Sequence, residues 1–273
     1  MSPLSGEPLI SSDIKAMPLG SVNKQVWTAE FPETASFERE EETLRDTSIV
    51  SDPRFGQAMR VTLPAGRWSG DGNGDHGLIN FPKLDRNVTE ATMDYYLRFD
   101  PNFDWSWGGK LPGLMGVAPG VNPIEPHKGS QTDQGWSARR MWLTNASYGS
   151  VKPSMANNMV TYFYWPGRNS RIAENVWWQD GPSRVELERG QWHHVRQHVR
   201  MNTPGQSDGV LREWVDGELV LERTNAEFRV DPSVEVTNIS WNIFRGGNTA
   251  DWRGSRDSWV DFADIKVVEG PPA

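Results

Sequence analysis

The most regular feature of the chain is a set of short runs in which hydrophobic and polar residues alternate. These runs are MDYYLRF (93–99), WSARRMWL (136–143), MVTYFYW (159–165), WHHVRQHVRM (192–201), REWVDGELVLER (212–223) and WVDFADIKVV (259–268). Gly, Pro, Asn and Asp interrupt them, and a period of two with such breaks is typical of β-strands. Within the fifth run, Asp216-Gly217 predicts a tight hairpin, because Asp-Gly suits a type I′ turn.

Helical periodicity is scarce, and the best candidate for a helix is the short segment EREEETLR (38–45). Many short strands without helical spacers predict an antiparallel sandwich or barrel. We therefore expect an all-β fold with a single domain over residues 25–270. A β-jelly roll, whose two antiparallel sheets offer a concave groove, fits this pattern. Residues 1–24 are rich in Pro and Ser and are expected to form an N-terminal arm.

Charge and cysteine content narrow the function classes. The 273 residues carry a formal net charge of −8, which argues against a nucleic-acid partner. The absence of Cys excludes disulfides, thiolate zinc sites, iron–sulfur clusters and a Cys nucleophile. No stretch approaches the roughly 20 apolar residues of a membrane helix, so no membrane partner is expected. The start MSPLSGEPLI lacks the features of a signal peptide. This leaves either a cytoplasmic protein or one whose signal has been removed.

Tryptophan is abundant, with 14 residues in the chain. Each can be explained by packing in the hydrophobic core. The alternative is contact with carbohydrate, because the flat indole face stacks on sugar rings and its N–H offers a hydrogen bond.

The run 192–201 carries an unusual cationic face. Side chains two positions apart share one face of a strand, which places His194, Arg196, His198 and Arg200 together. Such a face is either a solvated outer surface or the floor of a groove that binds an anionic ligand. We take these four residues as candidates for substrate binding.

Two further runs carry paired candidates. Ser137 and Arg139 share one face of the run 136–143, and Tyr162 and Tyr164 share one face of the run 159–165. A pair of Tyr residues is more often part of a half-buried sheet face than of a site. It gains a functional meaning if it meets Arg139 and Ser137 across the sheet.

Lys110 follows two glycines in FDWSWGGKLPGL (103–114), where a tight turn or close backbone approach would hold it in place. GGKLPGL, followed in order by Ser137-x-Arg139 and Tyr162-x-Tyr164, resembles polysaccharide lyase family 14. The resemblance extends over roughly residues 90–268 and includes FRGGN (244–248) and WVDFADIKV (259–267). It implies a β-jelly roll, a lyase acting on alginate or a glucuronate polymer, and these five residues as the functional set.

The chemistry of a uronate lyase suits these residue types. The enzyme removes the proton at C5, next to the carboxylate, and expels the oxygen at C4. Arg139 is suited to bind the carboxylate bidentately, and Ser137 could add a hydrogen bond. Lys110, Tyr162 and Tyr164 are candidates for the base and the acid, and the residues leave these roles open. We expect Lys110 and Arg139 to lower the tyrosine pKa values, and activity to rise into mildly alkaline pH.

Further candidates for contact with the substrate are Trp107, His76 and Arg245. The scheme requires no cofactor. DGNGD (71–75) places Asp71, Asn73 and Asp75 like the start of a calcium loop. However, His76 replaces the glycine of such a loop and Pro82 stands where its Glu belongs, so a structural Ca²⁺ is the less favoured alternative.

Three rival functions are compatible with a β-rich carbohydrate-active chain to different degrees. A glycoside hydrolase of the laminarinase type would need E-x-D-x-x-E on one strand, which the chain lacks. A non-catalytic carbohydrate-binding module is suggested by GQWHHV (190–195) and VDGEL (215–219), but leaves the Lys, Ser-x-Arg and Tyr-x-Tyr set unexplained. A glucuronan lyase would share the same chemistry. The leading hypothesis is a secreted or periplasmic monomer that cleaves an acidic polysaccharide, mannuronate-rich alginate, by β-elimination.

Overall fold

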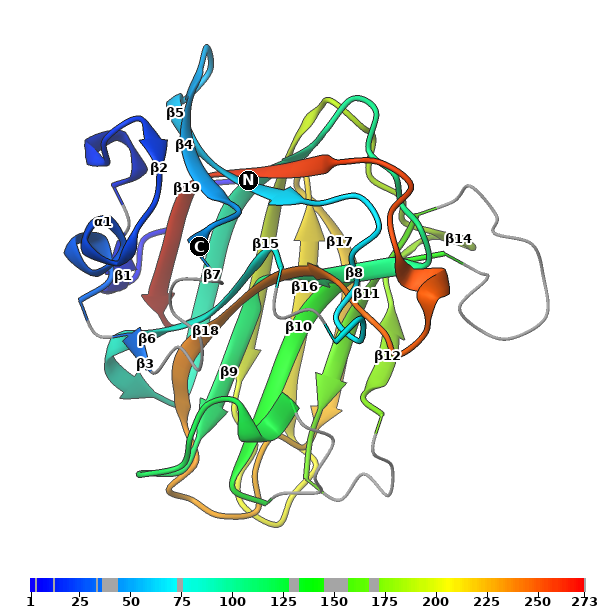
Figure 1. The fold of residues 1–273 in the computed structure, drawn as a ribbon. Helices are drawn as coiled ribbons and strands as arrows, with labels where there is room; N and C mark the ends of the chain where they lie inside the picture. The colour runs from blue at the N-terminus through cyan, green and yellow to red at the C-terminus, as the bar shows by residue number, and fades with distance from the viewer. Residues whose placement is uncertain are drawn as a thin grey trace.

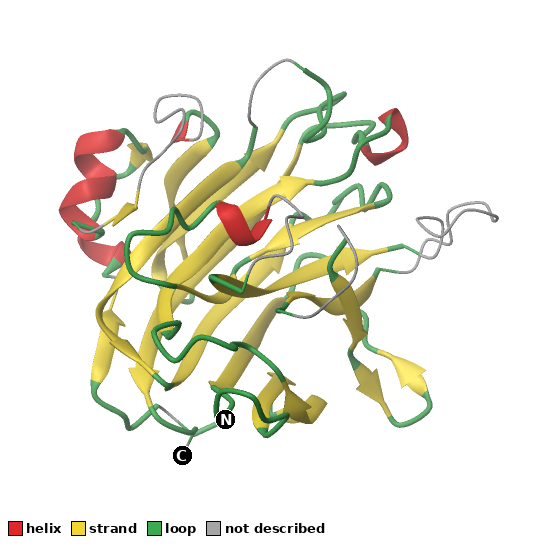
Figure 2. Ribbon diagram, turned by 90° about the horizontal axis from the view of Figure 1, so that it is seen from below, coloured by secondary structure: helices red, strands yellow, loops and turns green. Residues whose placement is uncertain are grey.

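Two antiparallel β-sheets stacked face to face make up most of the molecule (Figures 1 and 2). The structure is a computed structural model and describes residues 1–2, 4–11, 13–32, 34–35, 44–72, 76–127, 133–144, 157–166 and 172–272. The expectation of an all-β jelly roll is confirmed. The predicted helix over 38–45 lies almost entirely outside the described residues.

We call the eight-stranded sheet the front sheet. Its strands follow the order β12 (Glu174–Trp177), β11 (Asn158–Tyr164), β10 (Gly135–Leu143), β8 (Gly108–Leu111), β18 (Val236–Arg245), β6 (Leu78–Val88) and β3 (Thr34–Ala35). In addition, β9 (Gly113–Val117) pairs with both β10 and β18.

The nine-stranded sheet is the back sheet. Its order is β17 (Glu218–Ala226), β16 (Gly209–Val215), β15 (Trp192–Arg200), β7 (Glu90–Phe99), β19 (Ser258–Glu269), β5 (Gly56–Leu63), β4 (Thr47–Asp52) and β2 (Gly20–Ser21), with β1 (Pro8–Ser11) paired to β19. A separate pair is formed by β13 (Gln179–Asp180) and β14 (Ser183–Arg184). The helices among the described residues are η1 (Ile14–Ala16), α1 (Lys24–Glu30), η2 (Glu125–His127) and η4 (Ala250–Trp252). No described helix combines the length and apolarity needed to span a bilayer.

The hydrophobic core fills the space between the two sheets. Each strand sends alternate side chains into it, as the period of two predicts. The buried tryptophans are Trp27, Trp105, Trp136, Trp142, Trp178 and Trp241. For these residues the explanation by core packing is confirmed, and the remaining tryptophans are half-buried.

The N-terminal segment 1–24 joins the domain by strand pairing. β1 adds to β19 and β2 adds to β4, and Leu9 and Met17 are buried in the core. Helix α1 follows, and its start is capped by Asn23, whose Oδ1 accepts a hydrogen bond of 3.0 Å from the N–H of Val26. At seven residues α1 is too short to show a clear helical period.

The hairpin predicted at Asp216-Gly217 is confirmed. Strands β16 and β17 pair with Val215 opposite Glu218, which leaves a two-residue turn between them. Asp216 and Gly217 have φ values of 50° and 103°, and a type I′ turn requires positive φ at both positions.

Candidate active site

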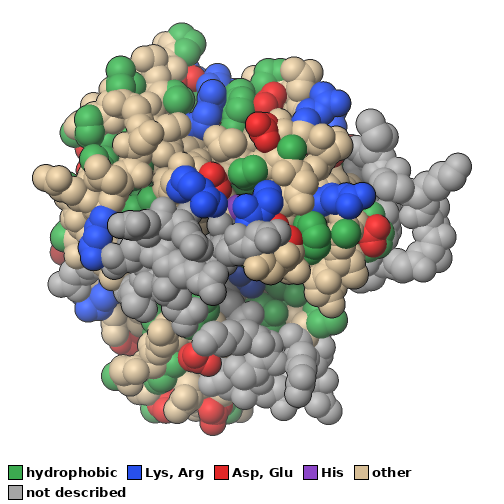
Figure 3. All heavy atoms as spheres, viewed as in Figure 1, with side chains coloured by type: hydrophobic (Ala, Val, Ile, Leu, Met, Phe, Trp, Pro, Cys, Tyr) green, Lys and Arg blue, Asp and Glu red, His purple; other side chains and the backbone are tan. Residues whose placement is uncertain are grey.

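The outward face of the front sheet carries a cavity of about 550 Å³. Strands β6, β8, β10, β11, β12 and β18 contribute to its walls, together with the loops at residues 69 and 246–252. Among its lining residues are Lys110, Arg139, Met141, Tyr162, Tyr164 and Phe244. Figure 3 shows this side of the molecule, where Lys and Arg side chains are visible across the middle of the face among acidic and apolar ones. The net charge of −8 is a property of the whole chain, and this face nevertheless carries several Lys and Arg side chains.

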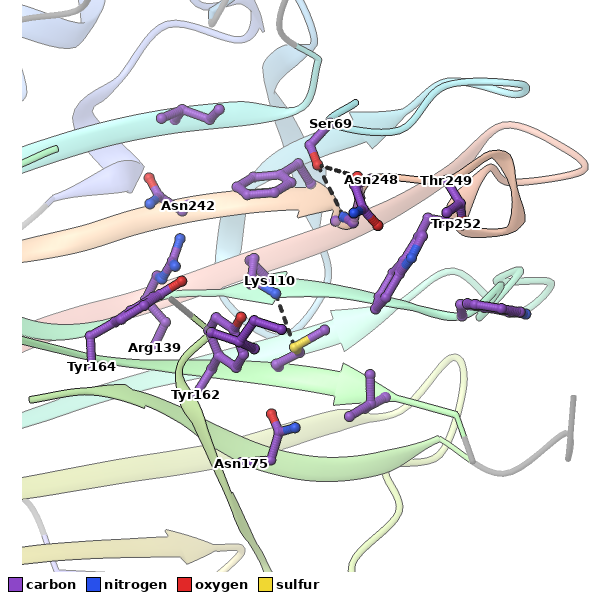
Figure 4. Close-up of a pocket in the computed structure, with 18 of the residues that line it drawn as sticks. Ser69, Lys110, Arg139, Tyr162, Tyr164, Asn175, Asn242, Asn248, Thr249 and Trp252 are labelled. Carbon is purple, nitrogen blue, oxygen red and sulfur yellow. Dashed lines mark hydrogen bonds between the residues drawn. The ribbon is translucent and has the colours of Figure 1, made fainter. Parts of the chain in front are cut away.

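Strand register brings the Ser-x-Arg and Tyr-x-Tyr pairs together. Strands β10 and β11 pair with Ser137 opposite Tyr164 and Arg139 opposite Tyr162. Directly opposite residues of an antiparallel pair project to the same side. This is the arrangement under which the tyrosine pair was predicted to have a functional meaning. Figure 4 shows the two tyrosines beside Arg139, with the hydroxyl of Tyr164 directed toward the guanidinium.

Two glycines place Lys110 against the same group. An added Cβ at Gly109 would lie 2.1 Å from the ring of Trp142, and one at Gly108 would lie 2.5 Å from the carbonyl oxygen of Trp142. Strand β8 can therefore approach β10 only because these two positions lack side chains. The resulting register sets Lys110 opposite Met141.

The amine of Lys110 is buried among uncharged groups. Only 7% of the residue is exposed, its Nζ lies 3.0 Å from the sulfur of Met141, and the same Nζ lies 4.0 Å from the ring centre of Tyr162. No carboxylate pairs with it among the described residues. Burial, and then repulsion by Arg139, hold the pKa of Lys110 well below its ordinary value. A lysine whose pKa is lowered in this way gives up its proton more readily than an exposed one, and its neutral amine can accept a proton.

Arg139 is a second buried basic residue in this cavity. It is 4% exposed, and within the described part of the chain it forms no ion pair with a carboxylate. Its guanidinium carbon lies 5.7 Å from the ring centre of Tyr162 and 5.9 Å from that of Tyr164, and its Nε has no hydrogen-bond partner in the part of the chain that the structure describes. Burial lowers its pKa. A buried guanidinium of this kind is suited to bind an anionic group of a ligand.

Tyr162 differs from the expectation drawn from its cationic neighbours. Burial and the neighbouring Tyr164 raise the pKa of Tyr162, and the opposing effect of Arg139 does not outweigh them. The prediction of a lowered pKa is therefore wrong for this residue, because desolvation of the phenolate costs more than one nearby cation returns. Tyr162 stays protonated at neutral pH and is suited to donate a proton.

Ser137 lies deeper than the rest of the predicted set. It is fully buried beside Tyr164, its Oγ has no hydrogen-bond partner among the described residues, and it is absent from the cavity lining. The structure thus brings Lys110, Arg139, Tyr162 and Tyr164 into one cavity and leaves Ser137 beside it.

The prediction that the cationic face of the run 192–201 forms the floor of a substrate groove is corrected by the structure. The run forms β15 of the back sheet, and Gln197 on its other face reaches the front sheet, where its Oε1 accepts from Leu114 N at 2.6 Å and its Nε2 donates to Ala138 O at 2.8 Å. Side chains of the alternate face must therefore point away from the front sheet and its cavity. They do not form a groove floor beside Lys110.

Acidic residues of the back sheet pair with cationic side chains of this face. The guanidinium of Arg196 lies 2.7 Å from the carboxylate of Asp94, which also lies 3.2 Å from Nε2 of His194. Nε2 of His198 lies 2.9 Å from Glu90. Arg200 is exposed and donates to the carbonyl oxygen of Asp208 at 3.0 Å. The face points away from the cavity, but it is not a solvated surface throughout, because Arg196 and His198 are only 3% and 2% exposed and are held by their acidic partners.

Arg245 and His76 are also not at the cavity. The fully buried guanidinium of Arg245 donates to the carbonyl oxygen of Leu63 at 2.8 Å and to Oγ of Ser258 at 3.1 Å, so it ties the end of β5 to the start of β19. His76 is buried, and burial, followed by the charge of Arg67, lowers its pKa to about 4. Neither residue lines the cavity. The structure therefore corrects the prediction that these two side chains contact the substrate.

Trp107 does line the cavity, next to a residue that the sequence analysis missed. Its ring centre lies 6.0 Å from that of Trp252, which belongs to η4. Met141 and Asn175 were missed as well. Met141 could have been predicted, because it shares the strand face of Arg139. Trp252 could not, because η4 lies outside every alternating run.

The candidate calcium loop is only partly described. Asp71 pairs with Arg67, while Asn73 and Asp75 lie outside the described residues. Across the described ranges, no group of three or more His, Asp or Glu side chains is arranged to hold a metal ion.

A β-jelly roll whose sheet holds Lys, Arg and Tyr side chains in one cavity defines a class, the polysaccharide lyases. The chain belongs to the polysaccharide lyase 14 family, whose model matches residues 52–265. The protein is therefore a lyase that acts on a polysaccharide.

Solved structures share this fold at low sequence identity. Alginate lyase Aly36B is 21% identical with a TM-score of 0.74, covering 98% of this chain and 99% of that one. The marine PL-14 alginate lyase from Aplysia kurodai is 19% identical with a TM-score of 0.76, covering 96% and 99%. Alginate lyase vAL-1 from Chlorella virus is 14% identical with a TM-score of 0.70, covering 97% and 100%. A comparison with curated proteins found no match.

Proposed function

We propose that the protein cleaves alginate, with mannuronate-rich regions preferred, by β-elimination. The observation that carries the proposal is the placement of a buried Lys110 amine and a buried Arg139 guanidinium, neither with a described carboxylate partner, against Tyr162 in one cavity. A uronate substrate would supply the carboxylate that Lys110 and Arg139 lack among the described residues. Support for alginate as the polymer comes from the similar folds, since variants of alginate lyase Aly36B form complexes with an alginate trisaccharide and an alginate tetrasaccharide.

In the proposed reaction each residue has one task. Arg139 binds the carboxylate and stabilises the negative charge that develops as C5 loses its proton. The neutral amine of Lys110 takes that proton, and the electron pair of the C5–H bond forms the C4–C5 double bond. The C4–O bond breaks, and the phenol of Tyr162 donates its proton to the departing oxygen. Tyr164 lies against Arg139 and orients it.

The substrate is tested by incubating the protein with polymannuronate, polyguluronate, mixed alginate and glucuronan. We expect ultraviolet absorbance from the unsaturated product, with polymannuronate giving the highest initial rate. New reducing ends without this absorbance would indicate hydrolysis and contradict the mechanism. A higher rate on glucuronan than on any alginate would keep the mechanism and replace the substrate.

Arg139→Lys tests how the carboxylate is bound. A Lys keeps the positive charge but cannot form the two parallel hydrogen bonds of a guanidinium, so kcat/KM is expected to fall about 10²-fold. The effect is measured in steady-state kinetics on polymannuronate. Arg212→Lys is the matched control, because Arg212 is a surface residue of the back sheet paired with Glu222 and its replacement leaves the rate unchanged. Equal rates for both variants would remove Arg139 from the mechanism.

A further inference from the structure

One part of the cavity is aromatic and uncharged. It is formed by Trp107, Leu143, Thr249 and Trp252, and we call it the aromatic end. The two indoles are half-buried, and their rings meet edge to face at 69°. Flat apolar side chains with polar groups nearby are well suited to receive the C–H face of a sugar ring. The reaction proposed above does not use this surface.

The indole of Trp252 is held in position by backbone contacts. An added Cβ at Gly247, whose φ is +142°, would lie 2.1 Å from the Trp252 ring, so the ring packs directly on this glycine. Gly247 is fixed in turn by Ser69, whose hydroxyl donates to its carbonyl oxygen and accepts from its N–H, both at 3.0 Å. The hydroxyl of Ser106 donates to the carbonyl oxygen of Trp252 at 2.6 Å. A side chain held in this way loses little freedom when a ligand arrives.

The aromatic end adjoins the reacting groups. Trp252 and Tyr162 pack against the same small cluster of Met141, Leu143 and Val160, and the sulfur of Met141 is the neighbour of the Lys110 amine. Figure 4 shows Lys110 and Trp252 along the same cavity, with Asn248 and Thr249 near Trp252. Two consecutive glycines connect them, because an added Cβ at Gly246 would lie 3.5 Å from the Lys110 Nζ and one at Gly247 would lie 2.1 Å from the Trp252 ring. A sugar ring on Trp252 would therefore be adjacent to the ring whose C5 faces Lys110.

We propose that Trp252, seated on Gly247 and flanked by Trp107, is a stacking platform for the sugar next to the reacting uronate. The nature of that sugar rests on the proposed function. Binding energy gained away from the reacting atoms can be used to position the reacting ring, so it raises the rate for chains long enough to reach the platform. Chain-length dependence is therefore the property that the platform confers.

The test compares Trp252→Ala, Trp252→Phe and Gly247→Ala on a length series of oligouronates, from the shortest that is cleaved to the polymer. We expect Trp252→Ala to lower kcat/KM about tenfold or more for long chains and to leave the shortest substrate nearly unchanged. Trp252→Phe retains most of the long-chain rate, because a ring remains. Gly247→Ala reproduces the loss by displacing the indole. Trp259→Ala, which removes a half-buried indole on the back sheet, is the control and changes neither rate.

Two outcomes would overturn the platform. A loss of equal size at every chain length would place Trp252 at the reacting ring or in general packing, and no loss would remove it from the site. Calorimetric binding of the same oligouronates to Lys110→Ala, with and without Trp252→Ala, separates this test from that of the lyase reaction. If the wild-type protein cleaves no uronate polymer, weaker binding in the double variant still supports the platform, and equal or absent binding overturns it.

Discussion

Replacing Lys110 with methionine is expected to abolish most lyase activity. In the proposed mechanism the Lys110 amine is the base that removes the C5 proton, and a methionine of similar length cannot accept a proton. Removal of a positioned base typically costs 10²–10⁴ in rate, and we expect a loss of about 10³-fold in kcat on polymannuronate. Lys266→Met is the matched control, because Lys266 is an exposed residue of the back sheet that pairs with Asp264 at 2.9 Å.

The same substitution is expected to make the protein more stable. Burial lowers the pKa of Lys110 in the folded state, whereas in the unfolded chain the amine titrates near about 10.4. Between these two pKa values the unfolded state binds the extra proton, so the stability of the wild type falls as the pH is lowered through this range and is constant below it. Methionine has no proton to bind. The pH-dependent part of its advantage is absent above about pH 10.4 and grows as the pH falls toward the pKa of Lys110 in the folded state.

Denaturant unfolding of both proteins at a series of pH values measures this difference. Lower activity with higher stability would identify Lys110 as a residue retained for function at a cost in stability. Two results would count against the assignment. Full activity in Lys110→Met would exclude it as the base, and a stability difference that does not change with pH would show that its amine is not buried as a titrating group.

Local pattern was enough to predict much of the fold and part of the site. The period of two identified the strands, and Asp-Gly identified one turn, because both depend on neighbours within a few residues. Alternation also placed Ser137 with Arg139 and Tyr162 with Tyr164. The register between β10 and β11 then faced one pair toward the other, which alternation alone does not specify.

The remaining features depend on contacts far apart in the chain. The alternating run at β15 has two faces, and which one meets the other sheet is decided by the partner strands. Asp94 lies about a hundred residues before Arg196, so no local pattern indicates that this cation is neutralised. The raised pKa of Tyr162 likewise depends on burial, which strand periodicity does not measure. Trp252 lies in a short 3₁₀ turn with no period at all.

A buried ion pair behind the site provides the second large effect, on stability. Arg140 follows Arg139 in β10 but points into the core, where its Nε lies 2.9 Å from Glu213 and both side chains are fully buried. Glu213 also accepts from Thr161 Oγ1 at 2.8 Å and from Gln197 Nε2 at 2.6 Å. These contacts join β10 and β11 to the back sheet directly beneath Arg139 and Tyr162.

Glu213→Leu is expected to lower the free energy of unfolding by about 3–5 kcal/mol, because it leaves the Arg140 guanidinium buried without its counter-charge. Arg140→Met leaves the carboxylate unpaired and is expected to be similarly destabilising. The double variant Arg140→Met/Glu213→Leu should recover the wild-type stability or exceed it, since two apolar side chains replace two desolvated charges. Thr161 Oγ1 still accepts from Trp178 and Gln197 still donates to Ala138 in that variant. Denaturant unfolding of the four proteins gives the coupling energy, and losses that simply add would show that the pair does not act as a unit.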